Sequence, residues 1–227
     1  MIDLSADMGE GASDEEQIWP MIDSANVACG GHTGDTASMT EAVRKARELS
    51  VSLGAHPSYP DRANFGRKTM SIEPAALRAS LVAQIGALRD LAGTLHHVKP
   101  HGALYNDAHR DRDLAEIIVE AMHELDPDLR LVCAADSEMA RAAGGHVIRE
   151  AFADRRYEPD GSLVSRAILG SLLTVDEAVA QAQLLVSESV VIARDGTRVP
   201  IAFDTLCIHA DMEHAAVRLR EIRNALA

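Results

Sequence analysis

The chain has 227 residues, enough for one large domain, and its 47% hydrophobic and 25% charged residues exclude a disordered, fibrous or membrane-bundle protein. Its 22 basic and 35 acidic side chains give a formal net charge of −13 at pH 7, which repels phosphate backbones and anionic lipids, so we expect neither a nucleic-acid nor a membrane partner. The N-terminus lacks the basic start and apolar run of a signal peptide, so we expect a cytoplasmic location.

Short apolar runs alternate with longer stretches of helical periodicity along the whole chain. Ser13 and Glu16 fit the capping box S-x-x-E and predict a short helix, and Asp195-Gly196 predicts a hairpin. In chain order we predict a strand at 1–6, the helix after Ser13, a strand at 24–28, a helix at 39–49, a strand at 51–55, a helix at 74–91, a strand at 97–99, a helix at 114–125, a strand at 131–134, a helix at 136–143, a strand at 147–151, a helix at 175–187, hairpin strands at 190–193 and 199–202, a strand at 205–208 and a helix at 214–226.

Seven principal strands that alternate with helices indicate an α/β protein with parallel pairing through right-handed crossovers. An irregular (β/α) barrel of TIM type, with about seven parallel strands, fits this pattern better than an open sheet. No linker rich in Pro, Gly or Ser divides the chain, so we expect residues 1–227 to form a single barrel domain.

Polar residues gather just after the ends of six of the seven predicted strands. In a parallel barrel these ends meet at one face, which is where active sites assemble. The residues in question are Asp7 and Glu10; Asn26, His32 and Asp35; His56 and Asp61; Lys99, His101 and Asn106; Glu150, Asp154 and Arg155; and His209 and Asp211.

Several of these features also have a purely structural interpretation. The glycine-rich loop at 30–35 could bring backbone N–H groups to a carboxylate or phosphate, or it could be a flexible loop whose Asp35 caps the next helix. His101 could likewise be a hydrogen-bonded core histidine. Cys29, Cys133 and Cys207 form no C-x-x-C pair and are expected to be reduced thiols, with Cys29 a packed residue rather than a nucleophile.

The 19 residues from His56 to Pro74 show no convincing periodicity, and a segment of this length in a compact domain is usually functional. Its prolines and the run Phe65-Gly66-Arg67 favour an ordered lid that carries one cation. No Walker phosphate loop, G-x-S-x-G elbow or H-E-x-x-H zinc helix occurs, and Gly9-Glu10-Gly11 lacks the third glycine of a dinucleotide fingerprint.

The strand-end motifs, taken together, resemble the LamB/YcsF lactam-utilisation family across nearly the whole chain. The sequence departs from the usual family pattern at Ser5, Gly31, Thr33 and Ala210, and none of these positions carries a proposed ionisable group. The matching segments are 5–11 (SADMGEG), 25–35 (ANVACGGHTGD), 54–61 (GAHPSYPD), 65–67 (FGR), 99–106 (KPHGALYN), 150–155 (EAFADR) and 207–211 (CIHAD).

The resemblance implies an irregular seven-stranded barrel related to the polysaccharide deacetylases. It also implies the A component of a 5-oxoprolinase, which opens 5-oxoproline (pyroglutamate) to L-glutamate while ATP is hydrolysed, with partners resembling subunits B and C. The missing phosphate loop agrees with a nucleotide site that a partner completes.

For such a reaction, Asp7 or Glu10 could act as general base, His56 or His101 as acid or base, and Lys99 could stabilise developing negative charge. The expected substrate-binding residues are Asn26, His32, Asp35, Arg67, Asn106, Asp154, Arg155, His209 and Asp211. Two alternatives stay open. One is a metal-dependent deacetylase or amidohydrolase with a divalent ion on His32, His56 or His101 together with Asp7. The other is a non-catalytic regulatory subunit.

Overall fold

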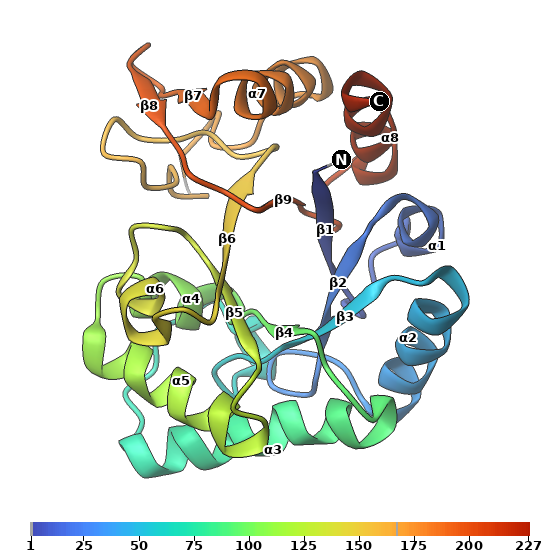
Figure 1. Cartoon of the computed structure of the whole chain (residues 1–227), viewed down its shortest axis with the longest axis vertical. Coiled ribbons are helices and arrows are strands. Elements are labelled where there is room, and N and C mark those ends of the chain that lie inside the picture. The colour runs from blue at the N-terminus through green and yellow to red at the C-terminus, as the bar shows by residue number, and fades with distance from the viewer. Residues whose placement is uncertain (1, 167) are drawn as a thin grey trace.

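Seven parallel strands close into a barrel in a computed structural model of the chain, which describes residues 2–166 and 168–227 (Figure 1). This confirms the predicted α/β barrel. The order around the barrel is β1 (Asp3–Met8), β2 (Ser24–Ala28), β3 (Ser52–His56), β4 (His97–Val98), β5 (Arg130–Cys133), β6 (Val147–Phe152) and β9 (Thr205–Ile208), and β9 pairs with both β6 and β1 to complete the ring.

Helices surround the barrel, and the predicted hairpin lies outside it as a separate two-stranded sheet of β7 (Val190–Ile192) and β8 (Arg198–Pro200). The helices are α1 (Glu15–Ile18), α2 (Thr36–Leu49), α3 (Pro74–Ala92), α4 (Gly102–Ala108), α5 (Arg112–Leu125), α6 (Glu138–Ala143), α7 (Val175–Glu188) and α8 (Ala215–Leu226), with 3-10 turns η1 (Trp19–Met21) and η2 (Arg62–Asn64).

The core between strands and helices is aliphatic, as the scarcity of aromatic residues requires. On α3, Leu81, Ile85 and Leu88 recur at helical spacing and are completely buried. Each such side chain contributes roughly 1.5–3 kcal/mol when removed from water. This burial, rather than helix propensity, fixes the long α3 against the barrel.

The side-chain caps predicted at the starts of two helices had opposite outcomes. The capping box predicted for Ser13 and Glu16 is wrong, because α1 begins at Glu15 and the Ser13 hydroxyl donates to the Asp14 carboxylate instead. The predicted cap at Asp35 is confirmed: its carboxylate accepts the N–H of Ser38, and the Ser38 hydroxyl accepts the N–H of Asp35.

The first strand begins and ends two residues later than the apolar run suggested, and its predicted start at Met1 lies outside the described residues. Asp7 is therefore inside β1, and Glu150 is likewise inside β6. Both side chains are buried in the barrel, where an ion pair with Lys99 replaces water. The sequence prediction ended β1 too early because it assumed an apolar interior.

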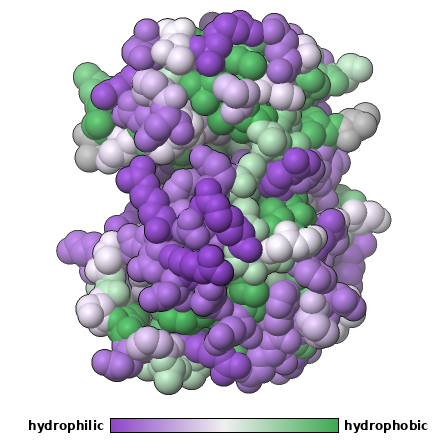
Figure 2. Space-filling view, turned by 60° about the vertical axis from the view of Figure 1, so that its left-hand side comes forward, coloured by the Kyte–Doolittle hydropathy of each residue, from purple (hydrophilic) through white to green (hydrophobic). Residues whose placement is uncertain are grey.

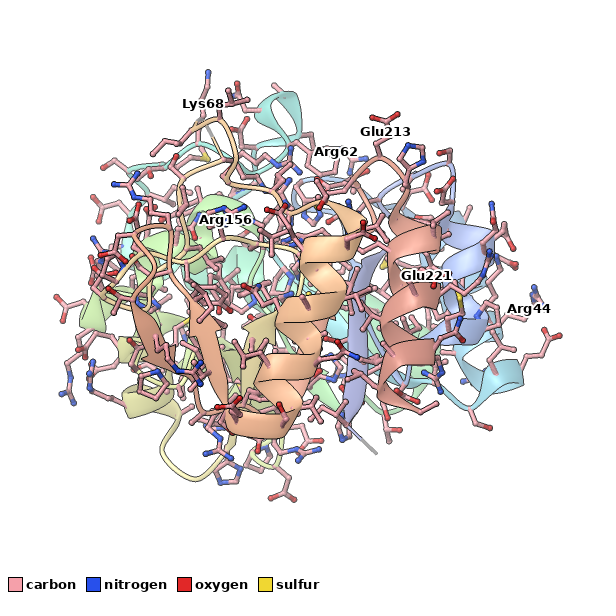
Figure 3. All side chains as sticks on the ribbon, turned by 90° about the horizontal axis from the view of Figure 1, so that it is seen from above. Arg44, Arg62, Lys68, Arg156, Glu213 and Glu221 are labelled. Atoms are coloured by element: carbon pink, nitrogen blue, oxygen red, sulfur yellow. The ribbon has the colours of Figure 1, made fainter. Side chains whose placement is uncertain are left out.

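Figure 2 shows hydrophilic side chains over most of one face of the molecule, with smaller hydrophobic patches between them. In Figure 3, Arg44 and Glu221 lie on the outer helices α2 and α8. Arg62 in η2, and Lys68 and Glu213 on loops, lie at the side where β1 ends. Among the described residues, no helix combines the length and apolarity needed to cross a membrane.

Candidate active site

A pocket of about 1070 Å³ opens at the C-terminal end of the barrel, the side on which Lys68 and Glu213 are labelled in Figure 3. Its floor is formed by Asp7, Glu10, His56, Lys99 and His101, which come from the ends of β1, β3 and β4. The topology thus gathers all five expected catalytic residues in one place. Their roles stay predictions.

Three of these floor residues and the neighbouring His32 form what we call the His/Glu cluster: Glu10, His32, His56 and His101. One ligand atom from each lies within 4.8 Å of the others, a spacing that could hold a metal ion. Glu10 Oε1 is 3.0 Å from His32 Nε2, 3.3 Å from His101 Nδ1 and 3.7 Å from His56 Nε2. The rings of His32 and His101 stack with centroids 3.7 Å apart.

Backbone carbonyls fix the tautomers of two of these rings. His56 Nδ1 lies 2.7 Å from the carbonyl oxygen of Lys99, and His101 Nε2 lies 3.0 Å from that of Phe65. A carbonyl only accepts hydrogen bonds, so each of these nitrogens carries the hydrogen. The lone pairs of the other two nitrogens, 3.0 Å apart, then face each other and require a cation, either a proton or a metal ion.

The donor set fits a divalent transition metal. Three imidazole nitrogens and one carboxylate oxygen suit Zn²⁺ and similar ions, and carbonyl-bound second nitrogens are the usual support of metal-binding histidines. Asp7, a candidate ligand from the sequence, lies outside the cluster, although its Oδ2 is 3.4 Å from His56 Nε2. Glu10, which the sequence did not single out as a ligand, is the carboxylate of the set.

The histidines give this floor a distinct electrostatic character. Burial disfavours the charge of Glu10, but its close contacts with the rings of His101 and His32 outweigh burial and hold the pKa of Glu10 well below its usual range. Burial also opposes the charge on His56, yet the attraction of Asp7 raises its pKa. Burial lowers the pKa of His32 to about 4. The carboxylates are therefore ionised, and His56 is the ring that holds an extra proton most readily.

Lys99 is the central cation of the barrel interior. Its Nζ lies 3.0 Å from Asp7 Oδ1, 3.0 Å from Glu150 Oε2 and 3.1 Å from Cys207 Sγ. Burial opposes the charge, but Asp7 and the other acidic neighbours raise the Lys99 pKa well above its usual range. The ammonium donates hydrogen bonds to Asp7 and Cys207 and forms an ion pair with Glu150, so we expect Lys99 to act on a bound molecule mainly through its charge.

The segment from His56 to Pro74 approaches the cluster closely where its Gly66 meets Gly102. A Cβ on Gly102 would lie 2.6 Å from the Gly66 carbonyl oxygen, so only glycine lets these two segments approach. This approach brings the Phe65 carbonyl to His101. The segment also carries Arg67 to the pocket wall, while its role as a lid stays a prediction.

Charged side chains from several loops surround the mouth of the pocket. Arg67 and Arg166 both bind Asp211, so three loops meet at one carboxylate. Asp61, an acidic residue of the same segment as Arg67, caps η2. Behind the mouth, Asp154 accepts hydrogen bonds from both the backbone and the ring of His209, at 2.7 and 2.9 Å.

The expected substrate-binding residues divide into two groups. Five of them line the pocket: Arg67, Asn106, Arg155, His209 and Asp211. The other four do not: His32 is in the cluster, Asp154 is buried behind His209, Asn26 is fully buried beneath Asp7, and Asp35 is exposed at the start of α2. For Asp35 the structural interpretation therefore fits its position.

Two residues that sequence reasoning passed over contribute here. Arg166 lies in an irregular loop, where no periodicity could point to the pocket. His97 was assigned only to a strand, yet its ring crosses the barrel interior and reaches Asn26 at 2.7 Å. The sequence feature that could have indicated this contribution is that His97 is a polar residue within a strand predicted to be buried.

Comparisons with known proteins agree with the barrel fold described above. The sequence matches the model of the LamB/YcsF family over residues 2–227. A lactam utilization protein from Thermus thermophilus is 41% identical, with a TM-score of 0.91 over 99% of this chain and 95% of that one. An Enterococcus faecalis protein assigned to cellobiose-phosphate cleavage is 12% identical, with a TM-score of 0.55 over 99% and 88% of the two chains, and shares the fold alone.

Proposed function

The chain belongs to the LamB/YcsF family, and we propose that it opens the cyclic amide 5-oxoproline to L-glutamate with hydrolysis of ATP. We propose further that it does so as one component of a complex, with partners resembling 5-oxoprolinase subunits B and C. The observation that carries the proposal is the convergence of two carboxylates, two histidines and a lysine on the floor of a pocket, with His32 beside them, in a chain 41% identical to a lactam utilization protein.

The chemistry of the substrate explains the need for ATP. A five-membered lactam is a resonance-stabilised amide whose closure is entropically easy, so its opening gains from coupling to ATP hydrolysis. Phosphorylation of the amide oxygen would activate the ring carbon, one water would attack there, and the ring C–N bond would break as the nitrogen takes a proton. A second water would then hydrolyse the resulting acyl phosphate to glutamate and phosphate. No Walker motif occurs in this chain, which is why the proposal places part of the nucleotide site on a partner.

The floor supplies groups for each proton transfer. The second oxygen of Asp7 faces His56 rather than Lys99, so this carboxylate can take a proton from the attacking water. We propose that His56 or His101 gives a proton to the leaving nitrogen. The charge of Lys99 stabilises developing negative charge nearby. A divalent ion on the His/Glu cluster would add the polarisation of a carbonyl or phosphoryl oxygen.

Reconstitution tests the proposal directly. The chain is mixed with subunits B and C, 5-oxoproline and ATP, and glutamate and ADP are measured against reactions that omit one component. We expect release of both products only in the full mixture. Equal glutamate release by this chain alone, or none with all components, would contradict it.

The His/Glu cluster favours a second candidate, a metal-dependent amidohydrolase that needs no ATP. Metal analysis of the purified chain, followed by an amide-hydrolysis assay without ATP or partners, separates it from the first. Activity that depends on the metal but not on ATP would support this second function.

A further inference from the structure

We infer that His97 is a positioning residue for Asp7, acting through Asn26. The inference rests on the catalytic role proposed for Asp7. It concerns a layer of side chains below the pocket floor, where β2, β3 and β4 place Asn26, Gly54 and His97 side by side in register. His97 is 2% exposed and Asn26 is fully buried.

Gly54 makes this arrangement possible. Its neighbours on either side, Asn26 and His97, are joined by a hydrogen bond of 2.7 Å that passes over the position where a side chain would stand. A Cβ on residue 54 would lie 2.1 Å from His97 Nε2. The strand therefore needs glycine here so that the imidazole can cross it.

The hydrogen bonds run in one direction, toward the catalytic carboxylate. Arg130 only donates, so the His96 Nε2 that it contacts accepts, and the hydrogen of His96 is on Nδ1. His96 Nδ1 is 3.1 Å from His97 Nδ1, which must then accept and leaves the His97 hydrogen on Nε2. Burial lowers the pKa of His97 to about 3, in agreement with a neutral ring.

The last two steps orient Asn26 and Asp7. His97 Nε2 donates to Asn26 Oδ1, which leaves the amide nitrogen to donate to Asp7 Oδ1 at 2.9 Å. The reverse amide orientation would set its oxygen against the carboxylate. Asp7 Oδ1 is thus held by Asn26 and by Lys99 at 3.0 Å, and Oδ2 is left for His56 and the pocket.

The purely structural alternative is that His97 only fills space in the barrel. The two roles differ in what a leucine would do at this position. Leucine fills the space but removes the donor, so under the positioning role Asp7 loses its fixed orientation. Glutamine can place its side-chain N–H near the position of Nε2 and restore the bond to Asn26.

Two spectroscopic measurements on the isolated chain test the inference without any assay. Imidazole ¹⁵N spectra, with His97 assigned by its absence in His97→Gln, should show a neutral ring with hydrogen on Nε2. The ¹³Cγ signal of Asp7 should shift in His97→Leu and return toward the wild-type position in His97→Gln. His123→Leu is the matched control, because this half-buried histidine lies on α5 outside the barrel.

A kinetic measurement in the reconstituted complex completes the test. His97→Leu should lower kcat by about 10- to 100-fold with KM within about 2-fold, and His97→Gln should recover most of the rate. Hydrogen on Nδ1, or an Asp7 signal unmoved by His97→Leu, overturns the inference whatever the rates. A shifted Asp7 signal in a complex that opens no lactam would instead uphold the contact and contradict the proposed function.

Discussion

His56 Nε2 and His101 Nδ1 face each other at 3.0 Å, while the opposite nitrogen of each ring is held by a backbone carbonyl. Two lone pairs at this distance require a cation between or beside them. This pair therefore links the geometry of the floor to metal binding.

Metal binding should depend on the His/Glu cluster. We expect Zn²⁺, added to the metal-free chain, to bind with a Kd at least about 10-fold weaker in His101→Ala than in the wild type, because a nitrogen ligand is lost. Isothermal titration calorimetry measures this difference. His214→Ala, an exposed histidine far from the cluster in sequence, is the control. Equal Kd values for Zn²⁺ in His101→Ala and His214→Ala would mean that the metal does not bind at the His/Glu cluster.

Asp7 should matter for rate more than for folding. Asp7→Asn keeps the shape of the side chain but cannot take a proton, so kcat in the reconstituted complex should fall by at least about 10²-fold. Circular dichroism should show an unchanged fold. Asp35→Asn, which lies at the start of α2, should retain turnover. Near-normal turnover in Asp7→Asn would return this residue to a structural role.

The mouth should recognise an anionic substrate through its arginines. The net charge of −13 opposes an anion at long range, so local cations must attract it. Arg67→Ala should raise the KM for 5-oxoproline by roughly 10- to 100-fold, since charge-assisted hydrogen bonds contribute about 1.5–3 kcal/mol.

Asp211 already binds Arg67 and Arg166, and a substrate carboxylate would have to compete with it. The KM for 5-oxoproline should also be measured by steady-state kinetics in Arg67→Lys and Arg166→Ala. If KM stays unchanged in both Arg67 variants, this arginine only ties loops together.

The thiols should be dispensable as nucleophiles. Cys29 is buried, and burial raises its pKa to about 12, so it stays a thiol at neutral pH. We expect Cys29→Ala to retain turnover within about 3-fold. Loss of turnover in a folded Cys29→Ala variant would require a nucleophilic mechanism.

Stability should decrease on acidification, in part through His97. Its pKa is about 3 in the folded chain and about 6.5 when unfolded, so the unfolded state alone takes up this proton between these values. The free energy of unfolding should therefore drop below pH 6.5, by at most about 1.4 kcal/mol per pH unit for this group. Urea unfolding of His97→Gln should show a shallower decline than the wild type. If the free energy of unfolding fell equally steeply with decreasing pH in both proteins, His97 would already be charged in the folded chain.

The barrel could be predicted because each strand and helix carries its own apolar period. β2 and β9 have the predicted bounds, and Asp35 caps α2 as expected. The site was harder to predict, because closure of the barrel, rather than local sequence, decides which residues come together there. Glu10 follows β1, and Asn26 lies in the neighbouring β2. Glu10 joins the His/Glu cluster, whereas Asn26 binds Asp7 beneath the pocket floor. Their positions along the strands separate these outcomes, because Glu10 lies two residues beyond the end of β1 whereas Asn26 lies inside β2.

The contacts of Lys99 have a consequence for protein synthesis. Its three partners belong to β1, β6 and β9, so they come from the beginning, the second half and the last tenth of the chain. A nascent chain that still lacks β9 cannot close the ring, because β9 pairs with both β6 and β1, and its Lys99 lacks the contact with Cys207. We expect the pocket floor to assemble in one late event, after the final strand has left the ribosome, so that shorter translation products carry no partly working site.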